Sequence, residues 1–159
     1  MADLTPWIRD VPDFPKEGIV FKDISPLLGD PKGFGLCMAE LEKLVDGVPC
    51  DKIAGIESRG FLFGAALAMC LGVGFIPVRK PGKLPWKTVR QEYSLEYGTD
   101  AVEMHVDAVE AGQDVLVVDD LIEKVGGRVS ALSFVVALDF IPWRDKIGDR
   151  DVRALLRYS

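Results

Sequence analysis

The segment that most constrains the fold runs from Asp114 to Asp120 and reads DVLVVDD. Four consecutive apolar residues, three of them β-branched, predict a strand buried inside a parallel sheet. Two adjacent carboxylates, Asp119 and Asp120, follow this strand directly. In open α/β sheets, ligands bind at the carboxyl ends of the strands, so this pair marks the first candidate site.

The residues after this pair are unusual for such a sheet. Two parallel strands are normally joined by about a dozen residues or more, and these residues usually form a helix. Here the next strand-like run, Ser130–Leu138, begins after only nine residues, Leu121–Val129. The pattern of these nine is typical of the tail of a helix that ends at a glycine C-cap, Gly126-Gly127. We therefore expect the end of a helix whose beginning is missing.

Length and composition restrict the class of protein. A chain of 159 residues with 48% hydrophobic and 28% charged residues is typical of one soluble globular domain, spanning residues 1–159. The net charge of −6 argues against nonspecific binding of nucleic acid, which needs a basic surface. No apolar stretch approaches the roughly 20 residues of a membrane span, and no secretory signal is visible. We expect a cytoplasmic protein that binds neither nucleic acid nor membrane.

The cysteines and the single histidine give no sign of a metal site. Cys37, Cys50 and Cys70 are odd in number and unevenly spaced, which favours reduced thiols in a core. His105 lies among alternating polar and apolar residues, a pattern that predicts a half-exposed strand with this side chain facing solvent.

Strands and helices alternate through the middle of the chain. The first 28 or so residues are rich in proline and predict an extended N-terminal arm or hood. Asp30 as N-cap and Pro31 at the first helical position then predict the start of a helix that continues to Gly47. The remaining expectations are a strand over Lys52–Ile56, a helix over Phe61–Leu71, a strand over Val73–Val78, and a mobile loop or irregular hairpin over Pro81–Glu92. This alternation predicts an α/β fold with a parallel sheet.

Charged loops follow three of the predicted strands. Arg59, Arg79 and Lys83 supply cations, and the pair after Val118 supplies carboxylates. A substrate that carries phosphates and a vicinal diol would suit this mixture, and the backbone N–H groups of Ser58, Arg59 and Gly60 could hold an anionic oxygen. A set of solvated loop charges would show the same pattern, and spacing alone does not decide between the two.

Several long segments, in order, resemble the adenine phosphoribosyltransferases from about Val11 to the C-terminus. The matching segments are PDFP (12–15), GIVFKDISP (18–26), ESRGF (57–61), RKPGKLP (79–85), YSLEYG (93–98) and VVDD (117–120). The resemblance implies the parallel-sheet type I phosphoribosyltransferase fold with an N-terminal hood. It also implies purine salvage, in which adenine and phosphoribosyl pyrophosphate give AMP and pyrophosphate.

The resemblance also implies roles for individual residues. Asp119 and Asp120 match the acidic pair that faces the ribose hydroxyls, and Glu96 matches the acid that exchanges a proton with the purine, with Tyr97 beside it. Phe21 matches the aromatic residue that stacks on adenine, while the backbone of Val20 and Lys22 reads the base edge. Ser58, Arg59, Gly60, Arg79 and Lys83 match the groups around pyrophosphate. Phe140 is a weaker assignment to the base site. The family implies Mg²⁺ held mainly by the substrate's own oxygens, and a homodimer.

The chain departs from the family after Asp120. The family continues with a Thr- and Gly-rich loop that wraps the 5-phosphate and opens a helix, and about a dozen or more residues of this kind are missing after Leu121. Either the protein carries residues that this sequence omits, or the deletion is genuine and the phosphate cradle is lost. Loss of a helix that covers the sheet would expose apolar surface, which favours omission. Omission would show as a Cα–Cα distance at Leu121–Ile122 well above about 3.8 Å.

Two other functions fit part of the pattern. A non-catalytic purine- or nucleotide-binding protein of the same fold would use the same site without turnover. Another α/β enzyme that combines an acidic strand end with magnesium, such as a phosphohydrolase, explains Asp119 and Asp120. It explains neither the hood nor the YSLEYG segment.

Overall fold

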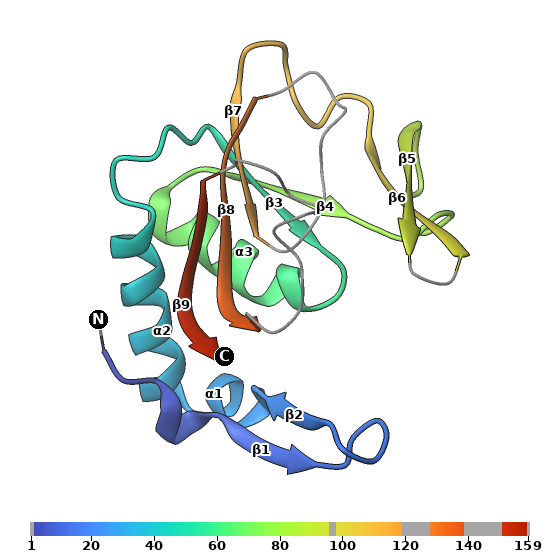
Figure 1. Ribbon diagram of the computed structural model, residues 1–159. Helices are drawn as coiled ribbons and strands as arrows, with labels where there is room; N and C mark the ends of the chain where they lie inside the picture. The colour runs from blue at the N-terminus through green and yellow to red at the C-terminus, as the bar shows by residue number, and fades with distance from the viewer. Residues whose placement is uncertain (1, 96–97, 119–127, 139–150, 159) are drawn as a thin grey trace.

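The computed structural model describes residues 2–95, 98–118, 128–138 and 151–158. Its centre is a five-stranded sheet in the order β4-β3-β7-β8-β9, and every neighbouring pair is parallel (Figure 1). The strands are β3 (Lys52–Ile56), β4 (Gly74–Val78), β7 (Asp114–Val118), β8 (Arg128–Leu138) and β9 (Val152–Tyr158). The predicted α/β class with a parallel sheet is confirmed.

The predicted strand bounds hold well at β3 and β4 and less well at β8. Strand β3 has the predicted bounds, and β4 begins one residue later than expected. Arg128 and Val129 were expected in a helix tail, but they pair with Asp114 and Val115 as part of β8. That prediction is wrong for these two residues, because pairing with β7 overrides a weak local signal. Residues 121–127 and the Leu121–Ile122 junction lie outside the described residues.

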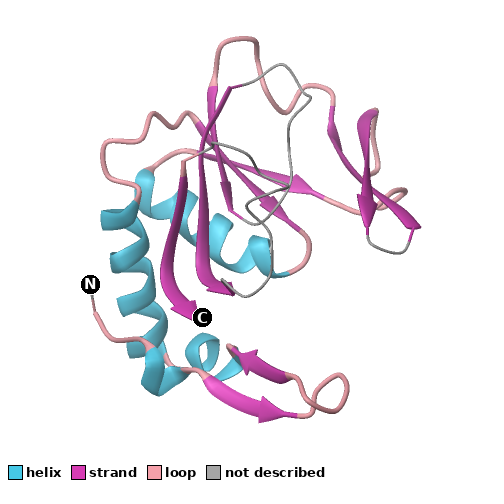
Figure 2. Ribbon diagram, in the orientation of Figure 1, coloured by secondary structure: helices cyan, strands magenta, loops and turns pink. Residues whose placement is uncertain are grey.

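Two helices cover one face of the sheet (Figure 2). Helix α2 (Pro31–Leu44) begins as predicted, because the Asp30 side chain accepts a hydrogen bond of 2.6 Å from the backbone N–H of Gly33. Helix α3 (Arg59–Leu71) begins two residues before the predicted Phe61 and ends at Gly72. Gly72 has a φ of 68°, the left-handed conformation that glycine adopts at low cost.

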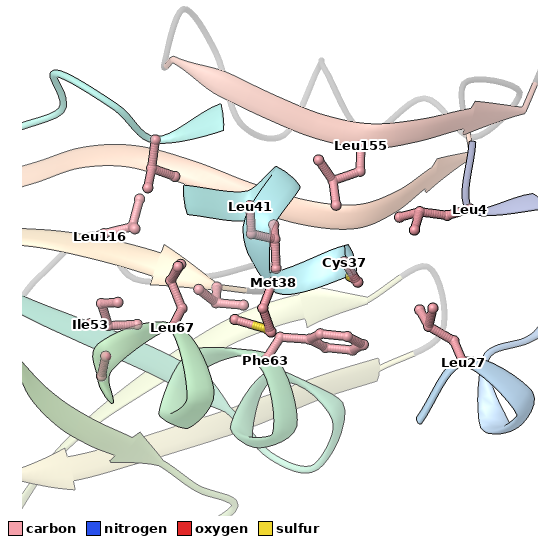
Figure 3. Close-up of a cluster of buried hydrophobic side chains, with 13 residues drawn as sticks. Leu4, Leu27, Cys37, Met38, Leu41, Ile53, Phe63, Leu67, Leu116 and Leu155 are labelled. Atoms are coloured by element: carbon pink, nitrogen blue, oxygen red, sulfur yellow. The ribbon is translucent and has the colours of Figure 1, made fainter. Parts of the chain in front are cut away.

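The main core lies between these helices and the sheet. Side chains of β7 alternate, so Leu116 and Val118 face the helices while Val115 and Val117 face the other way. Figure 3 shows the helix-side cluster, in which fully buried leucines from α2, α3 and β7 meet. Cys37 lies in this cluster, and burial raises the pKa of its thiol to about 12. All three cysteines are free, as predicted, although Cys70 is exposed rather than in the core.

The opposite face of the sheet meets an antiparallel hairpin, β5 (Thr88–Leu95) and β6 (Gly98–His105). Val102 and Met104 of β6 pack with residues of β3, β4 and β7 in a second buried cluster. Of the two alternatives expected over 81–92, a mobile loop or an irregular hairpin, the hairpin holds from Thr88, where the pairing is regular rather than irregular. His105 does not simply face solvent, because its Nε2 atom is buried and its ring lies edge-on to Trp86 at 6.2 Å.

The N-terminal segment is more ordered than an extended arm. It holds a 3₁₀ turn η1 (Thr5–Trp7), an antiparallel hairpin of β1 (Arg9–Pro12) and β2 (Val20–Asp23), and the short helix α1 (Ser25–Gly29). Leu4 and Leu27 are buried in the main core at its two ends. Figure 1 shows the hairpin at the end of the molecule towards which β8 and β9 point. The hood is therefore anchored at both ends and projects as a hairpin between them.

Among the described residues, no helix is both long and apolar enough to cross a membrane.

Candidate active site

The strand register brings two of the predicted charged loops together. Ile56 of β3 pairs with Val78 of β4, and Gly55 pairs with Val118 of β7. The next residues, Glu57 and Arg79, therefore leave neighbouring strands at the same edge of the sheet. This confirms the expected meeting of the first two loops. Asp119 and Asp120 follow Val118 in sequence but lie outside the described residues.

A largely buried carboxylate joins the cations at this edge. Glu57 accepts a hydrogen bond of 2.7 Å from Nε of Arg79 through Oε2, and one of 2.9 Å from Nζ of Lys83 through Oε1. The Glu57 side chain is 9% exposed, whereas the side chains of Arg79 and Lys83 are 35% and 52% exposed. The carboxylate thus lies on the protein side of the cluster and the two cations lie towards solvent.

The charge state of Glu57 follows from these contacts. Burial by itself would raise the pKa of this carboxyl group. The hydrogen bonds from Lys83, Arg79 and the Lys80 backbone outweigh burial and hold the pKa at about 2. Glu57 is therefore ionised at neutral pH, and the three side chains carry a net charge of about +1.

Further contacts fix Arg79 and the loop that follows it. Arg79 exchanges two backbone hydrogen bonds with Glu103 of β6, at 2.9 and 2.7 Å, and its Nη1 atom donates to the carbonyl of Lys83 at 3.2 Å. The guanidinium carbon lies 6.0 Å from the centre of the Phe61 ring, at the distance of a cation–π contact. Glu103 also accepts a hydrogen bond of 3.1 Å from the backbone N–H of Gly82.

The predicted anion-binding segment Ser58-Arg59-Gly60 is the start of α3. Ser58 and Arg59 are exposed, and Gly60 is buried. The strand and the helix start approach closely here, because a Cβ atom on Gly55 would lie 2.7 Å from the carbonyl oxygen of Gly60. Strand β3 thus sets the position of a helix N-terminus beside the Glu57 cluster, where backbone N–H groups favour anions.

The hood presents an aromatic pair. Phe21 is half-buried, and the ring of Phe14 meets it edge-on with the ring centres 5.2 Å apart. Val20 beside it is 50% exposed. Lys22 does not project freely, because its Nζ donates to Asp10 across the β1–β2 hairpin at 2.6 Å. Phe21 is therefore in part accessible, as stacking on a flat ring requires, and is not simply core.

Two predicted residues of the YSLEYG segment cannot be placed. Leu95 and Gly98 pair across the β5–β6 hairpin. Glu96 and Tyr97, which come between them in sequence, lie outside the described residues, as does Phe140. In the described part of the chain, no cluster of three His, Cys, Asp or Glu side chains could hold a metal ion.

Sequence reasoning missed the roles of Glu57, Phe14 and Glu103. Glu57 was part of the ESRGF segment but had no role of its own. The signal was available, because Glu57 directly follows a buried strand, as Asp119 does. Only the structure shows that Glu57 binds two cations from a different loop. The contacts of Glu103 with residues 79–82 depend on the pairing between distant segments, which the sequence does not show.

Comparison with known proteins settles the family. No family model matches the sequence. Adenine phosphoribosyltransferases from Kosmotoga olearia and Methanococcus vannielii are 47% and 48% identical to the chain, and the alignments span 98–99% of each protein. The chain belongs to the adenine phosphoribosyltransferase family.

Solved structures agree with this assignment. The crystal structure of the Thermoanaerobacter pseudethanolicus adenine phosphoribosyltransferase matches with a TM-score of 0.92 at 48% identity, and 98% of each chain is covered. The Saccharomyces cerevisiae enzyme, crystallised with adenine and an imino-altritol bisphosphate, matches with a TM-score of 0.86 at 39% identity, with 96% of each chain covered. The fold is that of the type I phosphoribosyltransferases, and the protein is a transferase that acts on a pentosyl group.

The alignment lengths also bear on the expected gap. The Kosmotoga olearia alignment spans 169 positions but only 98% of this 159-residue chain, about 156 residues. About 13 aligned positions therefore have no residue of this chain. This number agrees with the dozen or so residues that the sequence pattern predicted to be missing.

Proposed function

We propose that this chain transfers the ribosyl 5-phosphate of phosphoribosyl pyrophosphate to N9 of adenine and releases pyrophosphate, as a purine salvage enzyme. One observation carries the proposal. The cations that the family motif assigns to pyrophosphate, Arg79 and Lys83, meet at the carboxyl edge of the sheet, within hydrogen-bonding distance of one carboxylate. Arg79 lies beside the first turn of α3, with its guanidinium carbon 6.0 Å from the centre of the Phe61 ring.

The pyrophosphate end of the site comes from the loops after β3 and β4. Arg79 and Lys83 would bind the leaving group, together with Ser58, Arg59 and Gly60 at the start of α3. As the bond from ribose C1 to the pyrophosphate oxygen breaks, negative charge grows on the leaving oxygen and positive charge on the ribose. Cations that are already in place stabilise the negative charge on the leaving oxygen without reorganisation.

The adenine end comes from the hood. Phe21 would stack on the purine, and the backbone of Val20 and Lys22 would hydrogen-bond its edge. The exposed Val20 and the half-buried Phe21, supported by Phe14, offer a flat apolar surface that suits a purine. The packing of Leu4 and Leu27 of the hood into the main core would keep this surface in place.

The ribose would lie between the two ends. Asp119 and Asp120 would accept hydrogen bonds from its hydroxyls and stabilise the cationic ribose. Glu96 would exchange a proton with the purine, beside Tyr97. These four roles rest on the matching motifs, because the residues lie outside the described part of the chain.

The cofactor and assembly follow the family as proposals. Mg²⁺ would enter with the substrate, held mainly by phosphate oxygens and water, which are its preferred ligands. We also propose one catalytic domain over residues 1–159, with residues 1–28 as the hood, acting as a cytoplasmic homodimer. Leu62 and Met69 of α3 support a partner surface, because they are exposed and lie seven positions apart, on one side of the helix.

A non-catalytic nucleotide-binding protein of the same fold is the second candidate. The observation that favours it is the short connection between the end of β7 at Val118 and the beginning of β8 at Arg128. A connection of this length leaves little room for a loop that wraps the 5-phosphate. Such a protein would bind AMP or adenine without releasing pyrophosphate.

Pyrophosphate release distinguishes the two candidates. We would incubate the chain with phosphoribosyl pyrophosphate and Mg²⁺, with adenine, with hypoxanthine or with no base, and repeat the adenine reaction with excess chelator. The proposal predicts release with adenine, little with hypoxanthine or without base, and loss of release with chelator. Binding of AMP by calorimetry without any release would support the non-catalytic protein.

A further inference from the structure

We propose that Glu57 is a positioning residue that holds Arg79 and Lys83 at a fixed spacing for the two phosphoryl groups of pyrophosphate. The inference deepens the proposed function and rests on it for the identity of the anion. Glu57 itself would not touch the substrate.

The first argument is that each oxygen of the carboxylate takes one cation. Oε2 accepts from Arg79 at 2.7 Å and Oε1 from Lys83 at 2.9 Å. Glu57 is itself fixed to the sheet, because its backbone N–H donates to the carbonyl of Val78 at 2.9 Å. The positions of both cations are thereby set by the end of β3, although both belong to the segment after β4.

The second argument is the direction in which the cluster faces. The carboxylate side chain is only 9% exposed, whereas both cations are in part exposed. A lysine ammonium has three donors and a guanidinium five, so donors remain on both cations after the bonds to Glu57. A diphosphate arriving from solvent would therefore meet two oriented cations without breaking either ion pair.

The third argument concerns lysine, the more flexible of the two cations. A free lysine side chain loses much rotamer freedom when it binds an anion, and this loss weakens binding. Lys83 is already held by Glu57, so most of that loss occurs on folding rather than on binding. Preorganisation of this kind favours a ligand that needs both cations at once.

Removal of the Glu57 charge has two opposite effects. The local charge would rise by one unit, which strengthens the attraction of any anion. The two cations would also lose their fixed spacing, which weakens only an anion that bridges them. Glu57→Gln should therefore weaken the binding of pyrophosphate and leave the binding of inorganic phosphate unchanged or stronger.

The test is calorimetric titration of the full chain with inorganic pyrophosphate and, separately, inorganic phosphate. The variants are Glu57→Gln, Lys83→Met, the double variant, and Glu57→Asp as a conservative replacement. Glu40→Gln is the matched control, because Glu40 is another buried carboxylate with a lysine partner, Lys43 at 2.8 Å, on α2. Urea unfolding of each variant verifies that it is folded.

We expect Glu57→Gln to weaken pyrophosphate binding about tenfold, and to have less than about a twofold effect when Lys83 is already Met, because coupled residues are not additive. Glu57→Asp should recover part of the loss, and Glu40→Gln should bind like the unmodified chain. The inference is overturned if Glu57→Gln binds pyrophosphate equally well or more tightly, if the two losses simply add, or if the unmodified chain does not bind pyrophosphate.

The proposed function fails independently, if the unmodified chain binds pyrophosphate but does not release it from phosphoribosyl pyrophosphate with adenine. In that case the calorimetric comparison still decides the role of Glu57.

Discussion

At the scale of single residues, the site combines groups whose roles depend on their partners. Glu57 alone would be a carboxylate at the end of a strand, and Lys83 alone a loop lysine in solvent. Together with Arg79 they form a cluster with about one net positive charge facing outward. The motif around Lys83 indicated its function, but only the fold shows which carboxylate holds it.

The first prediction at this scale concerns Phe21. Replacing Phe21 with Ala removes the proposed stacking surface, so we expect the KM for adenine to rise about tenfold or more, because stacking of one base is worth about 1–3 kcal/mol. The KM for phosphoribosyl pyrophosphate should change little. Phe14→Ala, which removes only the edge contact with Phe21, is the graded control and should raise the adenine KM less. Equal changes in both KM values would contradict a stacking role.

Glu57 carries a prediction about acid stability. Its pKa is lowered to about 2 in the folded chain from a reference value of 4.5. The native state therefore binds this proton less readily than the unfolded state does, and the stabilisation is complete above pH 4.5 and is lost as the pH falls towards 2. Relative to Glu57→Gln, the unmodified chain should lose of the order of 1–3 kcal/mol of unfolding free energy over that interval.

Urea unfolding between pH 3 and pH 7 measures this difference. Glu92→Gln is the control, because Glu92 forms an exposed ion pair with Arg90 at 3.0 Å, and exposed pairs contribute little. A difference between the unmodified chain and Glu57→Gln that stays constant with pH would show that the carboxylate is not held ionised by its partners.

At the scale of elements, the helices and strands with strong local signals were predictable. The Asp30-Pro31 start of α2, the glycine end of α3 and the apolar run of β3 each contain the information for their own boundary. The β1–β2 hairpin was not predicted, because its strands have only four residues each. For the β5–β6 hairpin, the sequence predicted a half-exposed strand around His105 and a loop or irregular hairpin over 81–92, but not the regular pairing of the two strands. Arg128 and Val129 show the same limit at β8.

The next prediction concerns the packing of the hood against helix α2. A Cβ atom on Gly33 would lie 2.6 Å from Cδ1 and Nε1 of Trp7, whereas one on Gly35 would meet nothing within 4 Å. Gly33→Ala should therefore force the Trp7 ring away and destabilise the chain by about 1–3 kcal/mol. Gly35→Ala should stabilise it by about 0.5–1 kcal/mol, because alanine favours a helix more than glycine does.

Urea unfolding of the two variants measures these changes. The glycine-to-alanine substitution should lower the free energy of unfolding at position 33 and raise it at position 35. If both variants were stabilised, Trp7 would not pack over α2 as described, and the hood would not be anchored there.

At the scale of the whole molecule, the fold class and the family were predictable from the sequence. Six motifs in order identified the family; two of them lie in the hood, and two directly follow β3 and β4 at the carboxyl edge of the sheet. Of the predicted site residues, those on the loops after β3 and β4 and on the hood are placed. Asp119, Asp120, Glu96 and Tyr97 lie outside the described residues.

The connection between β7 and β8 also belongs to this scale. Nine residues separate the two strands, fewer than the usual crossover, and the alignment with a relative has about 13 positions without a residue of this chain. The sequence pattern predicts this difference after Leu121. A direct assay of the intact chain shows whether it still binds and uses a substrate that carries a 5-phosphate.

The most direct test of the central claim is the formation of AMP by a preparation whose intact mass has been verified. The mass of this sequence is 17.5 kDa. A preparation heavier than this by the dozen or so residues expected after Leu121 should, with adenine, phosphoribosyl pyrophosphate and Mg²⁺, form AMP and pyrophosphate in equal amounts, at a rate proportional to protein concentration. A preparation of 17.5 kDa that binds AMP without forming it would be the non-catalytic protein. A heavier, folded preparation that binds adenine or AMP but forms no AMP would contradict the account.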